Sequence, residues 1–367
     1  MKVSIGSKIV EGPWGGGNLF AVNLRNFLIK NGNKVIYDLS EPDIDLILLT
    51  DPRSRSESSS TFNHLEISKY IEHVNPNAVV IQRINECDER KNTKNINNFY
   101  LEASKVSDHV IFVSKWLRDI YVASGMPISK TSVIYAGANQ EIFNSEEKKQ
   151  FNPNKKINLV THHWSSHFNK GFEAYKFIDS LMSEKYWSEK INFTYIGNAS
   201  SEVELKNSNL IAPLSGRELA LELKNHDVYI TGSINEPSGN HHIEAAQCGL
   251  PIMYIDSGGI PEYCQDYGVS FTNGTFVEKL KHVIDNYPAF VDQLKEYPFN
   301  SEKMCEEFYS LFKSSIKLKK KMEVNVNLSL LGRYYLFKNK MLNKFRFILN
   351  IRNNIISKIR ANIRGIN

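Results

Sequence analysis

Short apolar runs rich in β-branched residues alternate with stretches of helical periodicity over the first 256 residues, and this alternation restricts the fold more than any other feature. Because parallel strands need a crossover between them, usually a helix, the pattern predicts parallel α/β sheets. In the first half the runs are KVSIGS, KVIYDL, DLILLT, AVVIQRI, HVIFVS and SVIYAG, and the helical stretches include NLFAVNLRNFLIKNG and NNFYLEASKVS.

The alternation is interrupted by the charged stretch EEKKQFNPNKK at residues 146–156, whose Asn and Pro content is typical of a linker. It then resumes with INLVTHH, INFTYIG, DVYITGS and PIMYID. The sequence therefore predicts two Rossmann-like parallel-sheet domains, at residues 1–150 and 151–316. Ligands of such sheets bind beyond the carboxyl ends of the strands, so two facing domains should form a cleft lined by strand-to-helix loops.

The composition is that of an ordinary globular protein of 367 residues, with 41% hydrophobic and 23% charged residues. Its four cysteines are scattered, without a Cys-x-x-Cys pair, so neither a disulfide framework nor a thiolate zinc site is expected and a reducing cytoplasm fits best. The N-terminus lacks the apolar core of a signal peptide, and no run of about 18 apolar residues could span a bilayer. We therefore expect a cytoplasmic protein.

Charge is distributed unevenly between the body of the chain and its C-terminal tail. Residues 317–367 carry thirteen Lys or Arg and one acid, a formal charge of +12. Since the whole chain carries +5, the first 316 residues carry −7. Nucleic-acid affinity depends on neutralising phosphates with Lys and Arg, so the acidic body argues against a nucleic-acid partner.

The stretch EPSGNHHIEA, at residues 236–245, follows the run DVYITGS and precedes an alanine-rich helical pattern. It predicts a loop that leaves a strand and enters a helix, with Ser238 as N-cap and Gly249 as the stop. The first backbone N–H groups of such a helix, those of Gly239, Asn240 and His241, form an anion site.

Two acids flank this predicted anion site. Glu236 stays in the loop, whereas Glu244 lies about 8 Å further along the helix at 1.5 Å per residue. Each carboxylate can bind hydroxyl groups on one side of a phosphate. A sugar nucleotide presents hydroxyls on both sides of its diphosphate, from ribose and from the sugar, so it matches this arrangement.

Three motifs together resemble the GT-B-fold, retaining glycosyltransferases of family four. They are Glu236-Pro237-Ser238-Gly239, Glu244-Ala245-Ala246-Gln247-Cys248-Gly249-Leu250-Pro251, and Gly258-Gly259-Ile260-Pro261-Glu262, with seven residues between the two signature glutamates. Upstream, SDHVIFVSKWLRDIY and VIYAGANQEIF are similar to the last strands of that family's N-terminal domain, and NKGFEAYKFI to its Lys-Gly helix start. The resemblance covers roughly residues 1–300 and not the tail.

The resemblance implies a role for each matching residue. Glu236 and Lys170 would be catalytic, with Glu236 near the reacting carbon of the donor sugar and Lys170 neutralising the diphosphate. Glu244 would hold the nucleotide ribose, and the amides of residues 239–241 and Gly259 would complete the donor site. Fixed donors in a dry cleft would stabilise the charge that grows on the departing phosphate. The family needs no metal and no cofactor beyond its nucleotide-sugar substrate.

One position departs from the family pattern. Ser165 stands where the family usually has an arginine, five positions before the lysine of the Lys-Gly start. A hydroxyl supplies no fixed charge, so one phosphate charge lacks its usual partner. His162, His163 or Arg217 could replace the arginine, or the donor could be held differently. A non-catalytic protein of the same fold that binds nucleotide-sugars or glycans therefore stays as the alternative function.

Two further stretches are candidates for ligand binding in the first domain. The glycines of EGPWGGGNLF, among them Gly16 and Gly17, allow a ligand close to the backbone, or form a tight turn. After the strand AVVIQ, the residues Arg83, Asn85 and Glu86 would bind acceptor hydroxyls, or belong to a solvated charged surface.

The paired histidines, His162-His163 and His241-His242, invite comparison with a metal site. Adjacent helical residues point about 100° apart, so His241 and His242 cannot chelate one ion without a distant third ligand. We expect polar lining of the cleft and no metal.

The basic tail shows helical spacing of apolar residues, interleaved with Lys and Arg. This pattern favours an amphipathic helix on an anionic membrane surface, although packing on the body or on a partner subunit would also satisfy it. We therefore expect a peripheral protein of the inner membrane face that acts on a glycan or lipid-linked acceptor in cell-surface polysaccharide synthesis. The apolar positions are Leu331, Tyr335, Leu342, Phe345, Leu349, Ile356, Ile359 and Ile363, and the basic ones include Lys338, Lys344, Arg346, Arg352, Lys358 and Arg360.

Overall fold

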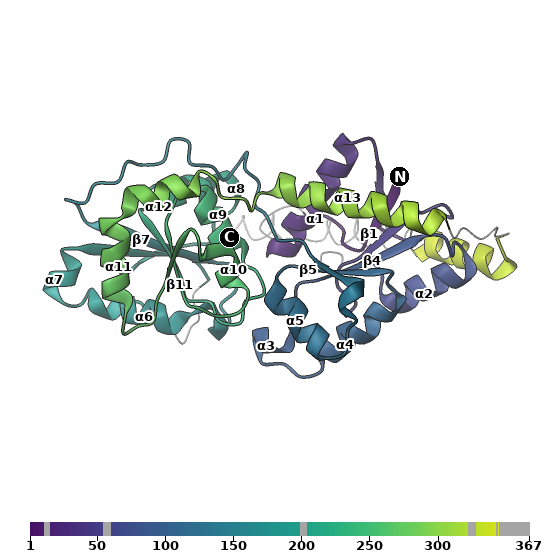
Figure 1. Ribbon diagram of the computed structural model, residues 1–367, viewed down its shortest axis with the longest axis horizontal. Helices are drawn as coiled ribbons and strands as arrows, with labels where there is room; N and C mark the ends of the chain where they lie inside the picture. Colours follow the sequence, from purple (N-terminus) through teal and green to yellow (C-terminus); the bar gives the residue numbers. More distant parts are fainter. Residues whose placement is uncertain (11–14, 54–59, 199–203, 322–327, 343, 345–367) are drawn as a thin grey trace, which may run out of the picture.

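Two six-stranded parallel sheets, with helices packed around them, lie along the long axis of the molecule (Figure 1). The structure is a computed structural model that describes residues 1–10, 15–53, 60–198, 204–321, 328–342 and 344. Every strand pairing within the two sheets is parallel. The α/β architecture predicted from the sequence, with two Rossmann-like parallel-sheet domains, is confirmed.

The first sheet has the strand order β2-β1-β3-β4-β5-β6. Its strands are β1 (Lys2–Ile5), β2 (Lys34–Ile36), β3 (Leu46–Leu49), β4 (Val79–Ile84), β5 (His109–Phe112) and β6 (Thr131–Val133). The helices between them are α1 (Gly15–Lys30), α2 (His64–His73), α3 (Asp88–Lys91), α4 (Ile96–Ala103) and α5 (Lys115–Ala123), with 3-10 turns η1 (Ser104–Val106) and η2 (Ile128–Lys130).

The second sheet has the order β12-β11-β10-β7-β8-β9, in which the order reverses between β7 and β10. Its strands are β7 (Ile157–His163), β8 (Ile191–Gly197), β9 (Asn209–Ile211), β10 (Val228–Thr231), β11 (Ile252–Tyr254) and β12 (Gly268–Ser270). The helical segments are η3 (Phe168–Lys170), α6 (Phe172–Leu181), α7 (Lys185–Ser188), α8 (Gly216–Lys224), α9 (Asn240–Gln247), α10 (Ile260–Cys264), α11 (Phe276–Asp285), α12 (Tyr287–Leu294) and α13 (Ser301–Lys320). The sequence runs did not predict β9 and β12, which have three residues each and lie at the sheet edges.

Side chains at the helix starts explain several of these boundaries. Asn63 accepts a hydrogen bond from the Glu66 amide while the Glu66 carboxylate accepts one from the Asn63 amide, so α2 begins with a capping box. Ser114 caps α5 and Asn300 caps α13 through a single bond, in which the side-chain oxygen accepts from a first-turn amide.

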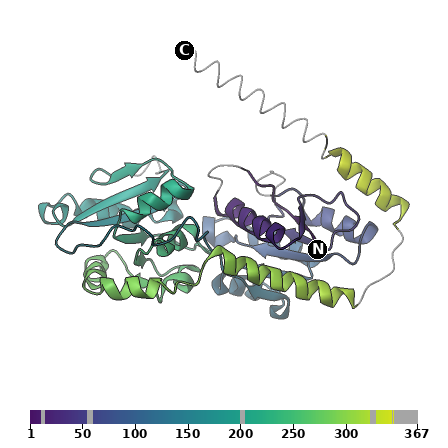
Figure 2. The ribbon, with the colours of Figure 1, turned by 90° about the horizontal axis from the view of Figure 1, so that it is seen from above.

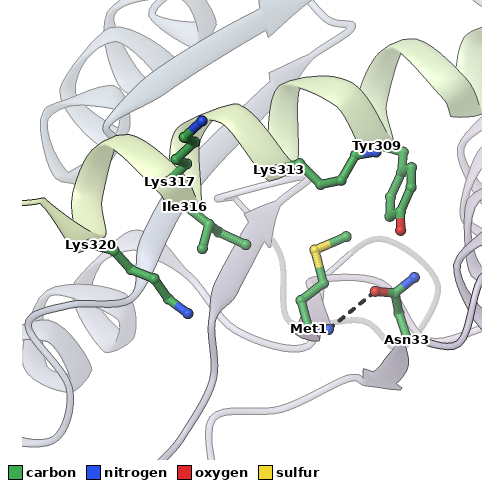
Figure 3. A pocket seen from close by; sticks show the side chains of 7 residues that line it. All are labelled: Met1, Asn33, Tyr309, Lys313, Ile316, Lys317 and Lys320. Carbon is green, nitrogen blue, oxygen red and sulfur yellow. Dashed lines mark hydrogen bonds between the residues drawn. The ribbon is translucent and has the colours of Figure 1, made fainter.

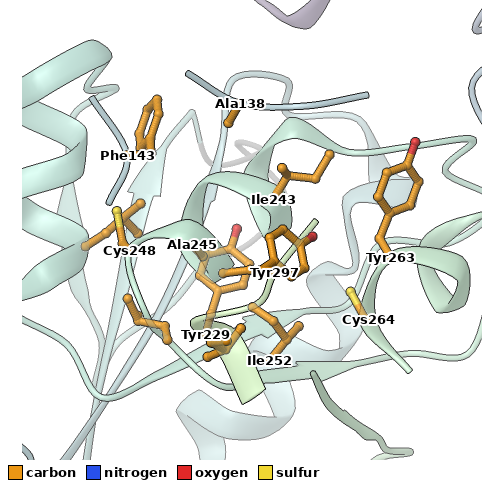
Figure 4. Close-up of a cluster of buried hydrophobic side chains, with 14 of the residues drawn as sticks. Ala138, Phe143, Tyr229, Ile243, Ala245, Cys248, Ile252, Tyr263, Cys264 and Tyr297 are labelled. Carbon is orange, nitrogen blue, oxygen red and sulfur yellow. The ribbon is translucent and has the colours of Figure 1, made fainter. Parts of the chain in front are cut away.

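The hydrophobic cores do not follow the chain order strictly. Ala138 and Phe143, which come after the last strand of the first sheet, pack into the core of the second domain with Tyr229, Ile243 and other residues (Figure 4). Conversely, α13 returns to the first domain, where Met304, Phe308 and Phe312 pack with strand residues of the first sheet. The domain division at residues 150 and 316 stays a prediction, but residues 301–312 contribute to the first domain's core.

The two chain segments that pass between the domains lie against each other. Ala138 and Asn300 form a parallel bridge, and a Cβ on Gly137 would lie only 2.1 Å from the Asn300 carbonyl oxygen. Gln247 of α9 donates from Nε2 to the carbonyl oxygens of Ala138 and Phe299, at 3.3 and 3.2 Å. Helix α9 thus begins after the loop that leaves β10, and Gln247 at its end is bound to the two segments that pass between the domains.

The described part of the tail is a helix over residues 330–342 that packs on the first domain beside α2 (Figure 2). Leu336 is buried in the cluster that contains Ile67 and Tyr70, and the Tyr335 hydroxyl donates to the Glu66 carbonyl at 2.8 Å. Packing on the body, one of the two alternatives for the tail, therefore holds for one face of this helix. The tail positions from Phe345 to Ile363 lie outside the described residues.

Candidate active site

The point where the second sheet reverses its strand order brings two loops together. β7 and β10 are neighbours, and the chain leaves β7 toward Lys170 and leaves β10 toward Glu236. Gly171, with φ of +91°, touches Gly232 so closely that a Cβ would lie 2.1 Å from the Gly232 carbonyl carbon. Only glycine fits this crossing, which sets the start of α6 against the loop after β10. Ligands of open α/β sheets bind at such a switch point.

Glu236 lies at the centre of an ion-pair network that joins the two domains. Its Oε2 accepts from Lys170 Nζ at 2.5 Å, and its Oε1 lies 3.1 Å from Nε of Arg90, a residue of α3 in the first domain. Glu236 is only 6% exposed. Burial pushes the pKa of Glu236 up, but Arg90 and Lys170 outweigh burial and hold the pKa below its ordinary value. The carboxylate is therefore ionised at neutral pH.

The backbone of helix α3 also contacts the loops that follow β7 and β10 in the second domain. Asn169 donates to the Arg90 carbonyl at 2.6 Å, and Asn235 donates to the Glu89 carbonyl at 3.2 Å. Arg90 was not among the residues singled out from the sequence. Its role depends on how the two domains face each other, which no local pattern reveals.

The start of α9 differs from the prediction by one residue. Ser238 is not the N-cap: the N-cap is Gly239, and no side chain caps the helix. The first-turn amides that begin with Asn240 and His241 are therefore free of a side-chain acceptor. A Cβ on Gly239 would lie 2.4 Å from Cε1 of His241, because the His241 ring folds back over this glycine. The helix does end as expected, at Gln247 with Gly249 at φ of +78°.

The second signature glutamate lies deeper in the same region. Glu244 is 5% exposed, and its Oε2 lies 2.9 Å from Nε2 of His162 at the end of β7. Burial lowers the pKa of His163 and His241 well below the ordinary value and that of His242 to about 3, so these three rings are neutral at physiological pH.

Several buried polar atoms around these loops have no hydrogen-bond partner among the described residues. They are Nδ1 of His162, Oγ of Ser233 and both ring nitrogens of His242. Buried polar atoms are normally satisfied, so unmet atoms here are consistent with a site that takes a polar ligand. Within the described residues, no group of three or more His, Cys, Asp or Glu side chains is placed to hold a metal ion.

The predicted donor-site glycines have different surroundings. A Cβ on Gly16, at the start of α1 in the first domain, would lie 3.1 Å from Oδ1 of Asn240, so the two helix starts approach across the domains. Nothing described lies within 4 Å of the same position on Gly17. Gly259 is packed against the carbonyl of Pro237 and the side chain of Ser114, which fits a support for the Glu236 loop better than contact with a ligand. Its amide donates to the Glu236 carbonyl at 2.9 Å.

Ser165 lies half-buried in the loop after β7, where its hydroxyl accepts from the His167 amide at 3.3 Å. Three residues were considered as replacements for the family's arginine. His162 is bound to Glu244, and His163 is bound to Tyr175 at 2.6 Å with a pKa that burial holds well below its ordinary value. Arg217 is exposed on α8. Arg90 is the cation that the structure places beside Lys170 and Glu236.

The predicted acceptor residues lie at the carboxyl end of β4. Glu86 is buried and pairs with Arg90 at 3.3 Å and with Arg53 and Lys91 at 3.7 Å each. Asn85 is half-buried, and Arg83 is buried with its guanidinium 4.0 Å from the centre of the Phe20 ring.

Helix α10 ties the second domain to the first beside this cleft. The Glu262 carboxylate accepts from the amides of Lys115 and Trp116, at 2.8 and 2.7 Å, and from the Tyr135 hydroxyl at 2.8 Å. An acid at the start of α5 complements the positive end of that helix. The Tyr263 hydroxyl donates to the Val113 carbonyl at 2.5 Å.

A separate pocket lies at the amino ends of β1 and β2 in the first sheet, next to Met1 (Figure 3). The Met1 ammonium donates to Oδ1 of Asn33 at 3.2 Å. Because Lys170 and Glu236 follow the carboxyl ends of their strands whereas Met1 and Asn33 precede β1 and β2, this pocket is remote from the site. It is lined by Met1, Asn33, Tyr309, Lys313, Ile316, Lys317 and Lys320.

Comparison with known proteins agrees with this geometry. Residues 192–310 match the family model described as glycosyl transferases group 1. The match covers 119 of the 367 residues, and the chain as a whole has a GT-B fold. A search of curated proteins gave no match.

GT-B glycosyltransferases are also among the similar solved structures. Sucrose-phosphate synthase from Thermosynechococcus elongatus is 14% identical, with a TM-score of 0.61 over 86% of this chain and 99% of the other. HepE from Anabaena, in complex with UDP, is 13% identical, with a TM-score of 0.64 over 86% of this chain and 100% of the other. The lipopolysaccharide outer core galactosyltransferase WaaB is 13% identical, with a TM-score of 0.59 over 86% of this chain and 99% of the other. At these identities the likeness concerns the fold.

Proposed function

We propose that this GT-B protein is a metal-independent, retaining glycosyltransferase that moves a sugar from a nucleotide-sugar to a glycan or lipid-linked glycan. The observation that carries the proposal is the cluster of Glu236, Lys170 and the uncapped start of α9 at the strand switch point. It combines an ionised acid, a cation and free amides in a mostly buried place. These are the groups that a sugar and its diphosphate need.

The proposed reaction balances without a cofactor. The bond between the anomeric carbon of the donor sugar and the β-phosphate oxygen breaks, and the acceptor hydroxyl oxygen bonds to the same carbon on the same face. The hydroxyl proton passes to the departing phosphate, and the products are a glycoside and a nucleoside diphosphate.

Each residue near the switch point has a distinct task in this proposal. The amides of Asn240 and His241 hold the diphosphate, and Lys170 stabilises the charge that grows on the departing phosphate. Glu236 accepts hydrogen bonds from donor-sugar hydroxyls, and Glu244 accepts them from the ribose. Arg90 supplies, from the first domain, the second cation beside the diphosphate that Ser165 cannot supply.

The proposed place of work is the inner face of the plasma membrane, in cell-surface polysaccharide synthesis. None of the helices in the described part of the chain has the length and apolarity that a membrane span requires. The tail helix leaves a row of apolar side chains exposed on the face away from the body, among them Tyr334 at 64% and Phe337 at 62%. Flanking lysines such as Lys338 and Lys340 suit an anionic lipid surface.

The test is a screen of UDP-, GDP-, ADP- and dTDP-sugars for thermal stabilisation of the full chain. UDP-glucose comes first, because HepE is also known in complex with it. A ligand at 100 times its dissociation constant adds about 2.7 kcal/mol to the free energy of unfolding. We expect one nucleotide series to stabilise the protein, and Glu244→Ala and Lys170→Ala to abolish the shift.

The matched control is Lys176→Ala, which removes an exposed lysine of α6 that pairs only with Glu173 among the described side chains. Its shift should equal that of the wild type. Unchanged shifts in Glu244→Ala and Lys170→Ala would remove both residues from the donor site. If a nucleotide-sugar stabilises the protein but no nucleotide is released in the presence of any glycan acceptor tested, the non-catalytic alternative is favoured.

A further inference from the structure

Arg83 is a buried cation without a counter-ion among the residues that the structure describes. It is the penultimate residue of β4 and only 6% exposed, yet its guanidinium makes no ion pair or hydrogen bond with any residue that the structure describes. Burial lowers the pKa of Arg83 to about 10, and the ionisable groups that influence it are Tyr263 and Tyr100 rather than a carboxylate. Arg83 is therefore still charged at neutral pH.

The neighbouring arginines are all paired, which makes Arg83 an exception. Arg53 binds Asp51 at 2.9 Å, and Arg90 binds both Glu86 and Glu236. Glu86 is three positions from Arg83 in the sequence but is occupied by Arg90, Arg53 and Lys91. A buried charge without a partner destabilises a fold, so its retention calls for another explanation.

The surroundings of Arg83 leave its hydrogen-bonding edge available. The Phe20 ring of α1 covers one face of the guanidinium at 4.0 Å, an arrangement that leaves the N–H groups directed in the plane. Asn85, two positions further along the chain, is half-buried, and its side-chain amide makes no hydrogen bond with the described residues. Both side chains come from the carboxyl end of β4, on the first domain's side of the cleft.

We propose that Arg83 binds an anionic group of the acceptor, a carboxylate or a phosphate, so that the enzyme selects acidic acceptors. This inference rests on the proposed glycosyltransferase function and replaces the expectation that Arg83 binds hydroxyls. A planar guanidinium binds both kinds of anion through two parallel hydrogen bonds. The donor diphosphate has its own cations, Lys170 and Arg90, at Glu236. The carboxylate source would be an acidic sugar, and the phosphate source a phosphorylated or lipid-linked glycan.

The test measures binding of three soluble probes to the full chain at pH 7.5, with UDP or the nucleotide found in the screen kept saturating. The probes are glucose, glucuronate and glucose 6-phosphate, titrated by calorimetry. We expect one anionic probe to bind on the order of tenfold or more tightly than glucose, since charge-assisted hydrogen bonds are the strong ones. The tighter of the two anions identifies the source.

Three variants make the test specific. Arg83→Met should abolish the preference for the anion while leaving the nucleotide affinity within about twofold, and Arg83→Lys should keep part of it because it keeps only the charge. Lys317→Gln, which removes a cation from the remote pocket of Figure 3, should change neither affinity. Arg83→Met should also raise the thermal midpoint of the ligand-free protein, because it removes an unpaired buried charge.

Results of two kinds would overturn the proposal. One is an equal affinity of the wild type for glucose and both anions, or an anion preference that persists in Arg83→Met. The other is a loss of nucleotide affinity of more than tenfold in Arg83→Met, which would assign Arg83 to the donor diphosphate. If no nucleotide-sugar binds while the anion preference still depends on Arg83, the proposed function fails and the anion site stands.

Discussion

Arg90 of the first domain and Glu236 of the second form an ion pair across the domain boundary, with 3.1 Å between Nε and Oε1. The same carboxylate binds Lys170 of its own domain at 2.5 Å. The acid that we place beside the donor sugar is thus held from both sides of the cleft. Its position and its charge both depend on how the domains pair.

Replacing Arg90 by glutamine should lower kcat more than it raises KM for the donor. Loss of one preorganised charge at a departing group costs about 10²–10³ in rate. Because Arg90 helps to hold the pKa of Glu236 down, its removal raises that pKa, and the acidic limb of the kcat profile should move to higher pH. Initial rates of nucleotide release between pH 4.5 and 8 provide the measurement.

Lys91→Gln is the control for this variant, since Lys91 is the adjacent residue and pairs with Glu86 but not with Glu236 among the described contacts. It should keep the wild-type pH profile. An Arg90→Gln profile that coincides with that of the wild type would show that Arg90 does not influence Glu236 during turnover.

Gly239→Ala should abolish nucleotide binding with little change in overall stability. The new Cβ would lie 2.4 Å from the buried His241 ring, so this ring or the first turn of α9 must shift at the place where the diphosphate is expected. Gly274→Ala is the matched control, because its nearest described atom lies 3.9 Å away and its backbone is not left-handed. Calorimetric titration with the nucleotide compares the two, and equal affinities would exclude the start of α9 from the site.

Glu262→Ala should weaken the contact between the domains. It removes hydrogen bonds from two amides of α5 and from the Tyr135 hydroxyl, and we expect a loss of about 1–3 kcal/mol in the free energy of unfolding. Urea denaturation measures this loss. Glu218→Ala, which removes an exposed acid from the first turn of α8, should change stability far less. If the two variants are equally stable, the Glu262 contacts do not stabilise the native domain arrangement.

The exposed face of the tail helix should be needed for membrane binding. A triple substitution of Tyr334, Phe337 and Met341 by serine should reduce cosedimentation with phosphatidylglycerol vesicles without unfolding the protein, since these side chains are 51–64% exposed. Leu318→Ser, on the exposed side of α13, is the control. Undiminished sedimentation of the triple variant would move any lipid contact away from this helix.

The sequence determined the fold to a large extent because each long strand was an apolar run bounded by turn residues. In the second sheet, the sequence runs cover the whole of β7, β8, β10 and β11. The strands β9 and β12 are too short for a periodic signal. The start of α9 was misplaced by one residue, because Gly239 rather than Ser238 occupies the N-cap without a side-chain bond.

The site was predictable only where its residues are close in the chain. Glu236, Glu244 and the start of α9 belong to one loop and one helix, so their spacing was informative. Arg90 belongs to a four-residue helix in the other domain, and its contact with Glu236 follows from domain packing. Glu86 is expected to bind acceptor hydroxyls, and the structure adds its ion pairs with Arg53, Arg90 and Lys91, which depend on the folded arrangement of the first domain.

The most direct test of the central claim is a crystal structure of the full chain with the nucleotide-sugar that stabilises it. We expect the diphosphate within about 3 Å of the first-turn amides of α9 and of Lys170 Nζ, with Glu236 facing the sugar. A nucleotide-sugar bound away from the strand switch point, or with its diphosphate away from α9, would show that the donor site lies elsewhere.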